Sequence, residues 1–214
     1  MKIVLSDLDK TLVDVNDQLV HALCMALDFL GKSYERSLLQ RTSNLYRYLS
    51  SLGINVAEKD FWDFFDNYDK RDEGIRQGRI RLFPYSIDFL ESMHDKKIAI
   101  VSDTPWKKAE CSVRNFGLDR YVSVFSNWDI SRHKRGKPDC ELAVEALVKL
   151  DYRSDDLLYF VGDDAVDMEC AENLEKHLRK KVVKIHVRRS GGCLLGVDFT
   201  VPDLLYASEI IEGD

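Results

Sequence analysis

The chain has 214 residues, of which 45% are hydrophobic and 32% charged, and its formal net charge is −6. A chain of this size can bury a sizeable core without disulfides, and its acidic balance argues against a general nucleic-acid binder. Its five widely spaced cysteines indicate reduced thiols, and its longest apolar helical stretch, residues 19–30, is too short to span a membrane, so we predict a soluble protein of the cytoplasm.

The first predicted element is a strand over residues 2–7 (KIVLSD), an apolar run that ends in an aspartate. Unbroken apolar runs of this length are typical of strands that are buried on both faces of a parallel sheet. The pattern then becomes helical, and we predict an all-helical insert over residues 14–83. Leucines or aromatic residues recur at helical spacing over 17–30, 35–52 and 58–69.

From residue 84 onward, predicted helices and strands alternate. The strand pattern returns at 97–103 (KIAIVSD), 122–126, 157–164 (LLYFVGDD) and 181–187. Helical patterns begin near Pro84, Pro105, Asp139 and Val166. This alternation predicts an α/β fold, a doubly wound and mostly parallel sheet with a Rossmann-like core, formed by residues 1–13 and 84–214.

Several predicted strands end in polar residues. Because ligands bind at the carboxyl ends of the strands in open α/β sheets, we expect these side chains to converge, together with a lysine and an aspartate that open two helices. Two carboxylates about 4 Å apart repel by about 4 kcal/mol at an effective dielectric constant near 20, so a cation is needed there. The convergent set comprises Asp7, Asp9, Ser102, Lys137, Asp163, Asp164 and Asp167.

These residue types suit the transfer of a phosphoryl group. Carboxylates are the ligands that a hard cation such as Mg²⁺ prefers, and a lysine with hydroxyl groups can hold phosphoryl oxygens. One aspartate can attack phosphorus, and a second can move protons.

Four motifs resemble those of the haloacid dehalogenase-like hydrolases. DLDKT (7–11) is similar to the first motif of the family, Asp-x-Asp-x-Thr, and Ser102 to the serine or threonine of the second. Lys137, followed by proline, is similar to the third, and GDDAVD (162–167) to the fourth. The four occur in the order of the family. In position and length, the insert 14–83 resembles the cap of the phosphoglycolate phosphatase-like branch, which closes over the site and selects the substrate.

The resemblance implies a role for each matched residue. Asp7 would be the nucleophile that becomes an aspartyl phosphate, and Asp9 would protonate the leaving group and later activate water. Thr11, Ser102 and Lys137 would bind the transferring phosphoryl group, and Thr11 would also orient the first loop. The implied Mg²⁺ ligands are Asp7, the Asp9 carbonyl, Asp163 and Asp167, the last of them close by or through water.

The resemblance thus implies a Mg²⁺-dependent phosphatase for a small soluble phosphate monoester of the phosphoglycolate or sugar-phosphate type, acting as a monomer or homodimer. A phosphomutase uses the same motifs and stays an alternative. A phosphoacceptor signalling domain is a distant alternative, because such domains carry the acceptor and the acidic pair on different strands and lack a cap.

Some residues near the motifs are interpreted differently or left open. Asp164 is interpreted as a helix N-terminal residue rather than a ligand. Arg188 and Arg189 are interpreted as part of a solvated face. Lys10 and Asp103 depart from the family's common residues, and their roles stay open.

Overall fold

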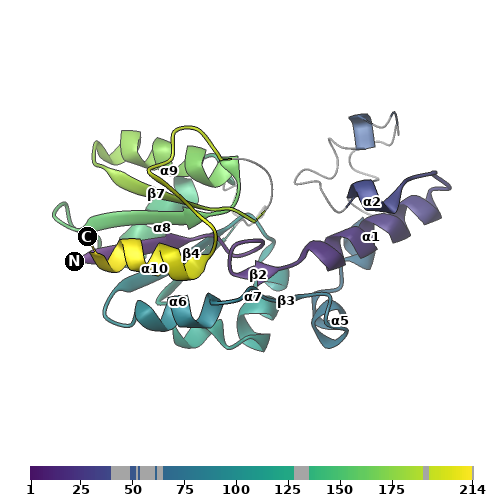
Figure 1. Cartoon of the computed structure of the whole chain (residues 1–214), viewed down its shortest axis with the longest axis horizontal. Coiled ribbons are helices and arrows are strands. Elements are labelled where there is room, and N and C mark those ends of the chain that lie inside the picture. The colour runs from purple at the N-terminus through teal and green to yellow at the C-terminus, as the bar shows by residue number, and fades with distance from the viewer. Residues whose placement is uncertain are drawn as a thin grey trace. The chain divides into compact units, whose positions relative to one another are not determined.

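The computed structural model describes residues 1–39, 49–51, 53, 61, 65–127, 135–189 and 193–213. Its internal contacts divide the chain into two compact units (Figure 1). One unit comprises Met1–Val13 and Leu82–Asp214, and the other is the intervening segment Asp14–Arg81. None of the helices within the described ranges is long and apolar enough to cross a membrane, and the five cysteines are free thiols.

The larger unit is built on a six-stranded sheet in which all neighbouring strands are parallel. The register places Val4 beside Ile98 on one side and Tyr159 on the other. The strands predicted from the sequence are confirmed, whereas β8 at the edge was not predicted. In spatial order they are β5 (Val124–Asn127), β4 (Lys97–Ser102), β1 (Lys2–Ser6), β6 (Leu157–Gly162), β7 (Val182–Val187) and β8 (Phe199–Val201).

Helices cover both faces of this sheet, as Figure 1 shows. On one face α8 packs against β4 and β5, and α9 packs against β6 and β7; on the other, α10 packs against α6 and the β7–β8 edge. The prediction of a doubly wound α/β sheet is confirmed. The bounds are α6 (Ser86–Ser92), α7 (Trp106–Asn115), α8 (Glu141–Lys149), α9 (Ala165–Leu178) and α10 (Leu204–Gly213).

The apolar sequence of β1 follows from its central place in the sheet. Alternate residues of a strand point to opposite faces. Ile3 and Leu5 join a buried cluster with Leu142 of α8 and Leu174 of α9, whereas Val4, also fully buried, faces the other way. Because both faces of β1 are covered by apolar side chains, the aspartates Asp7 and Asp9 follow the strand at its carboxyl end rather than lying within it.

The smaller unit has an apolar core of its own. Leu23 and Leu27 of its first helix lie in one buried cluster with Phe61 and Phe65. This core gives the segment the burial that a separately packed unit needs. The helices that the structure describes here are α1 (Asn16–Phe29), α2 (Arg36–Leu39) and α5 (Arg71–Arg76).

Only part of the predicted helical insert can be compared with the structure. The helix predicted over 17–30 is confirmed as α1. Most of the helix predicted over 35–52 lies outside the described residues, as does much of the one predicted over 58–69.

Two short strands pair where the chain leaves and re-enters the larger unit. They are β2 (Val13–Asp14) and β3 (Arg81–Leu82), which form a two-stranded sheet. Arg81 and Asp14 form an ion pair across it, with Nη2 and Oδ2 3.0 Å apart. The two connections are therefore joined to each other by backbone pairing and by charge.

Candidate active site

Adjacent strands bring the acidic loops together. β6 and β4 flank β1, so the loops that follow these three strands share one edge of the sheet. Asp7 comes directly after β1, and its N–H donates to the carbonyl of Val161 on β6 at 2.9 Å. Asp163 comes directly after β6. Residues far apart in the sequence thus meet because their strands are parallel neighbours.

Lys137 lies between two buried carboxylates. Its Nζ is 2.5 Å from Asp7 Oδ1 and 2.6 Å from Asp167 Oδ1, and the exposed fractions of the three side chains are 4%, 7% and 2%. Asp167 is held in turn, because its Oδ2 accepts the N–H groups of Asp163 and Asp164, both at 3.1 Å. Such charge-assisted hydrogen bonds are the strong ones, so Asp167 fixes Lys137 and Lys137 fixes Asp7.

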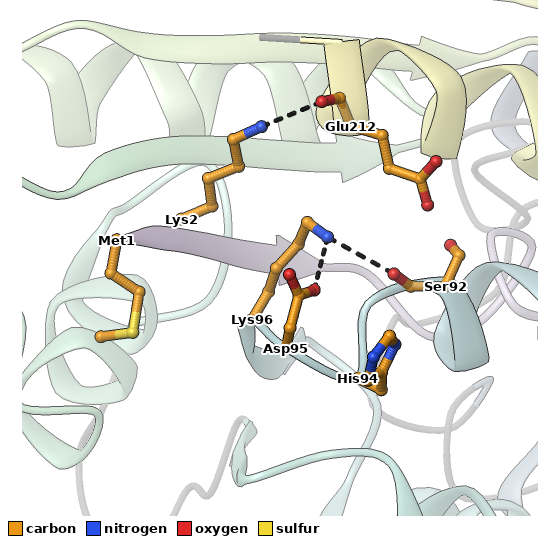
Figure 2. A pocket seen from close by; sticks show the side chains of 7 residues that line it. All are labelled: Met1, Lys2, Ser92, His94, Asp95, Lys96 and Glu212. Atoms are coloured by element: carbon orange, nitrogen blue, oxygen red, sulfur yellow. Dashed lines mark hydrogen bonds and ion pairs between the residues drawn. The ribbon is translucent and has the colours of Figure 1, made fainter.

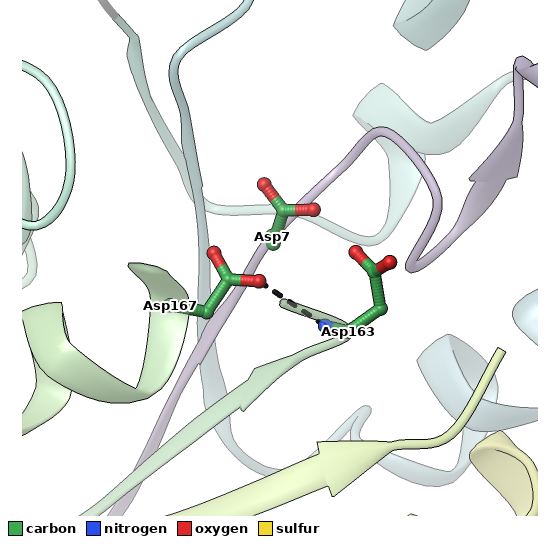
Figure 3. A group of neighbouring side chains, drawn as sticks. All are labelled: Asp7, Asp163 and Asp167. Carbon is green, nitrogen blue, oxygen red and sulfur yellow. Dashed lines mark hydrogen bonds between the residues drawn. The ribbon is translucent and has the colours of Figure 1, made fainter. Parts of the chain in front are cut away.

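Thr11 holds the other side of the Asp7 carboxylate. Its buried hydroxyl lies 3.0 Å from Asp7 Oδ2 and 3.3 Å from Asp163 Oδ1. One oxygen each of Asp7, Asp163 and Asp167 lie within 4.8 Å of one another, and Figure 3 shows the three side chains gathered at the strand ends. The structure therefore brings five of the expected residues into one connected group: Asp7, Thr11, Lys137, Asp163 and Asp167.

Burial and mutual repulsion shift the protonation of this group. Desolvation raises the pKa of Asp7 well above its usual range although Lys137 lowers it, and the other two acids raise it further. Desolvation and the charge of Asp167 raise the pKa of Asp163 to about 7. Burial by itself would lower the pKa of Lys137, but the carboxylates of Asp167 and Asp7 outweigh it and raise that pKa well above its usual value. Lys137 therefore carries its positive charge at neutral pH, but this one charge is too little to keep the neighbouring carboxyl groups ionised as readily as they are in water.

The chemistry of the donor set fits a hard divalent cation. Lys137 pairs with two of the three carboxylates, so the group stays net negative when all the acids are ionised. Mg²⁺ prefers carboxylate oxygens and would cancel that charge. Asp7 and Asp163 are the candidates for direct ligation, because the donors to their oxygens are side chains that can turn away, whereas Asp167 Oδ2 is held by two backbone N–H groups.

Asp9 and Ser102 lie in a second group, which Thr104 joins. Ser102 is buried at the end of β4, and its Oγ accepts the N–H of Thr104 at 3.2 Å. The Thr104 hydroxyl donates to Asp9 Oδ2 at 2.7 Å. Sequence reasoning missed Thr104, since a threonine two residues beyond a motif serine carries no signal of its own.

Asp103, whose role the sequence left open, holds the loop that carries Lys137. Its Oδ1 accepts the backbone N–H of Lys137 at 2.8 Å. A Cβ on Gly136 would lie 2.8 Å from the same oxygen, and a Cβ on Gly162 would lie 2.5 Å from the side chain of Asp167. A side chain at either position would therefore force the neighbouring aspartate to shift, and glycine avoids that.

The sequence model of one protein family matches most of the chain. The family is described as haloacid dehalogenase-like hydrolase, and the match covers residues 4–178, which contain both groups of side chains. The chain belongs to this family.

Individual relatives share the architecture of this haloacid dehalogenase-like hydrolase. The phosphorylated carbohydrates phosphatase of Thermotoga maritima is 25% identical over 182 residues, which cover 81% of each chain. The crystal structure of a candidate phosphatase from Clostridium difficile superimposes with a TM-score of 0.81 at 19% identity, covering 98% of both chains. That of a candidate phosphoglycolate phosphatase from Lactobacillus plantarum gives 0.77 at 18% identity, covering 98% of this chain and 100% of the other. At such identities the likeness to the two solved structures shows the fold.

In this hydrolase Arg189 supports the loop after β1, so its interpretation as part of a solvated face was wrong. It is half-buried, and it donates from Nη2 to the carbonyl of Thr11 at 2.5 Å and from Nε to that of Lys10 at 3.3 Å. Its guanidinium carbon lies 3.8 Å from the ring centroid of Phe83. Lys10 has a left-handed backbone with φ of 67°, which glycine or asparagine adopts more readily. No sequence signal marks Arg189, because these two hydrogen bonds are made to backbone carbonyls.

Two other residues support the loop after β6. Asp164 is the N-cap of α9 and accepts the N–H of Val166, which confirms its interpretation as a helix N-terminal residue. His186 on β7 places its Nε2 3.2 Å from the carbonyl oxygen of Asp163. Burial lowers the pKa of His186, so a neutral ring donates this hydrogen bond near pH 7.

A hollow of about 480 Å³ lies at the opposite, amino edge of the hydrolase's sheet (Figure 2). Met1 and two lysines are among its lining residues. Lys2 Nζ donates to the carbonyl of Ile211 at 2.6 Å, and Lys96 Nζ to that of Ser92 at 3.4 Å. These lysines cap the carboxyl ends of α10 and α6, so we assign the hollow a structural role.

Proposed function

We propose that this hydrolase is a Mg²⁺-dependent phosphatase that acts on small phosphate monoesters through an aspartyl-phosphate intermediate. The observation that carries the proposal is the buried Asp7 carboxylate, held between Lys137 and Thr11 beside two further acids. Carboxylates serve as nucleophiles toward phosphorus, and a cation with hydroxyl groups suits the transferring group.

The chain's own residues would carry two chemical steps. In the first, an Asp7 oxygen bonds to phosphorus while the bond from phosphorus to the ester oxygen breaks, and Asp9 donates a proton to that leaving oxygen. In the second, Asp9 takes a proton from water as the water oxygen attacks phosphorus, which releases inorganic phosphate and restores Asp7. Ser102 and Lys137 would bind the phosphoryl oxygens, and Thr11 would orient Asp7.

The same residues would hold the metal. Asp7, Asp163 and the Asp9 carbonyl would bind Mg²⁺ directly, and Asp167 would act at one remove, because its Oδ2 is held by two backbone N–H groups. When bound, Mg²⁺ supplies positive charge that neutralises the acids and screens the phosphoryl oxygens.

The substrate class rests on the relatives. The name of the Thermotoga maritima protein refers to phosphorylated carbohydrates, which supports a sugar phosphate or a phosphoglycolate-like ester as the substrate. We propose that the segment 14–83 is a cap that selects among such esters, and that the enzyme acts in the cytoplasm. The free state of the cysteines is consistent with that compartment.

A panel of phosphorylated metabolites, assayed with Mg²⁺ for inorganic phosphate, tests the proposal. We expect turnover by the wild type, loss of turnover in EDTA, and less than a few percent of the activity in Asp7→Asn, with circular dichroism confirming that the variant is folded. Substantial turnover by Asp7→Asn would contradict the proposal. Interconversion of sugar-phosphate isomers without net phosphate release, followed by phosphorus NMR, would identify a phosphomutase instead.

A further inference from the structure

Thr104 contacts the carboxylate that would transfer protons. Its Oγ1 donates to Asp9 Oδ2 at 2.7 Å, the usual length of an O–H···O hydrogen bond. Both residues are half-buried, so water competes less for this bond than it does on an open surface. Thr104 therefore restricts the directions in which the Asp9 carboxylate can point.

Thr104 is itself held from two sides. Its N–H donates to the Oγ of the buried Ser102 at 3.2 Å, and its carbonyl accepts from Nδ2 of Asn127 at 3.5 Å. Ser102 ends β4 and Asn127 ends β5. The hydroxyl that reaches Asp9 is thus placed by two strands of the sheet rather than by a free loop.

We propose that Thr104 is a positioning residue that orients Asp9 for proton transfer to the leaving oxygen. This inference rests on the proposed function. An aspartate side chain turns about two bonds, and efficient proton transfer needs donor and acceptor within about 2.6–3.2 Å. In this step a proton passes from Asp9 to the ester oxygen as the P–O bond breaks, whereas Thr104 keeps its own proton. Without the Thr104 hydroxyl, Asp9 samples orientations from which it cannot reach that oxygen.

The need for this proton depends on the leaving group, which makes the role measurable. p-Nitrophenolate leaves at neutral pH without being protonated, whereas a phenolate with a pKa of about 10, as in tyrosine, leaves poorly unless it is protonated. p-Nitrophenyl phosphate and phenyl phosphate are similar in shape. Their kcat/KM values report the steps up to phosphorylation of Asp7 and exclude the later attack of water, which is common to both.

The experiment compares both esters in Thr104→Val, Thr104→Ala, Thr104→Ser and Asp9→Asn, with thermal unfolding to confirm that each variant folds. For Thr104→Val and Thr104→Ala we expect kcat/KM to fall about tenfold more for phenyl phosphate than for p-nitrophenyl phosphate. We expect a larger contrast of the same sign for Asp9→Asn, because general acids contribute about 10²–10⁴-fold. Thr104→Ser, which keeps the hydroxyl, should restore most of the loss.

Two results would overturn the inference in distinguishable ways. Equal losses for the two esters in the valine and alanine variants, with the contrast present in Asp9→Asn, would remove the role of Thr104 and leave the proposed function standing. Absence of the contrast in Asp9→Asn would remove the role of Asp9 as the acid, and the inference would fall with it.

Discussion

Replacing Lys137 with methionine would expose the electrostatic cost of the site. The side chains have similar lengths, but methionine leaves the carboxylates of Asp7 and Asp167 buried without the ammonium that lies 2.5 Å and 2.6 Å from them. Removing one partner of a buried ion pair costs about 3–5 kcal/mol of folding free energy. The free energy of unfolding of natural domains is about 5–15 kcal/mol, so we expect Lys137→Met to fold but with much reduced stability.

Urea unfolding at pH 8, with and without Mg²⁺, measures this cost. We expect the free energy of unfolding of Lys137→Met to be lower than that of the wild type by about 3–5 kcal/mol in EDTA. Saturating Mg²⁺ should restore a larger share of stability in this variant than it adds to the wild type, because a divalent ion can replace the lost positive charge among the acids.

Lys184→Met is the matched control. Lys184 is also a buried cation, with its Nζ 3.0 Å from Glu175 Oε2, but it lies outside the acidic group. Its replacement should lower stability by an amount that Mg²⁺ does not restore. A loss below about 1 kcal/mol for Lys137→Met in EDTA, or an equal response of both variants to Mg²⁺, would refute the electrostatic account of the site.

Three further predictions follow from other parts of the hydrolase. The pKa of Asp163 is raised to about 7, so the metal-free folded protein keeps a proton that the unfolded chain releases above about pH 4. The free energy of unfolding should therefore fall as the pH rises from 5 to 7. Asp163 alone contributes up to about 1.4 kcal/mol per pH unit to this fall. Asp163→Asn should flatten that slope in thermal unfolding with EDTA, and an unchanged slope would contradict the assignment. Arg189→Met should lower both Tm and kcat more than Arg188→Met at the exposed neighbouring position, since only Arg189 holds the loop after β1; equal effects would count against that support. Replacing residues 15–80 with a short Gly/Ser linker should leave a folded core that loses more kcat/KM for the true substrate than for p-nitrophenyl phosphate, whereas equal losses would mean that the insert does not select substrates.

The parts of the fold that the sequence predicted well are those with a strong local pattern. The continuous apolar runs that became β1, β4 and β6 are typical of strands buried on both faces, and parallel strands place their carboxyl ends at one edge. That is why the positions of Asp7 and Asp163 could be expected to be near each other. β8 (Phe199–Val201) has only three residues, too few for a visible period. α10 does carry helical spacing, at Leu204, Ala207 and Ile211, and could have been predicted from it.

The supporting residues of the site could not be predicted, for a physical reason. Thr104 and Arg189 act through contacts between loops that are distant in the sequence, and Arg189 bonds to backbone carbonyls that every residue type possesses. Asp103 likewise bonds to a backbone N–H of another loop. Such contacts depend on where the strand ends lie in three dimensions, which periodicity and motif spacing do not specify.

The most direct test of the account is to find the phosphoryl group on Asp7. The enzyme is quenched in acid during turnover of p-nitrophenyl phosphate with Mg²⁺, the acyl phosphate is reduced with borohydride, and the tryptic peptide that spans residues 3–10 is examined by mass spectrometry. We predict that aspartate is converted to homoserine at position 7, whereas Asp9 is unchanged. Reduction at another residue, or none at position 7 in enzyme that accumulates a burst of p-nitrophenolate, would contradict the account.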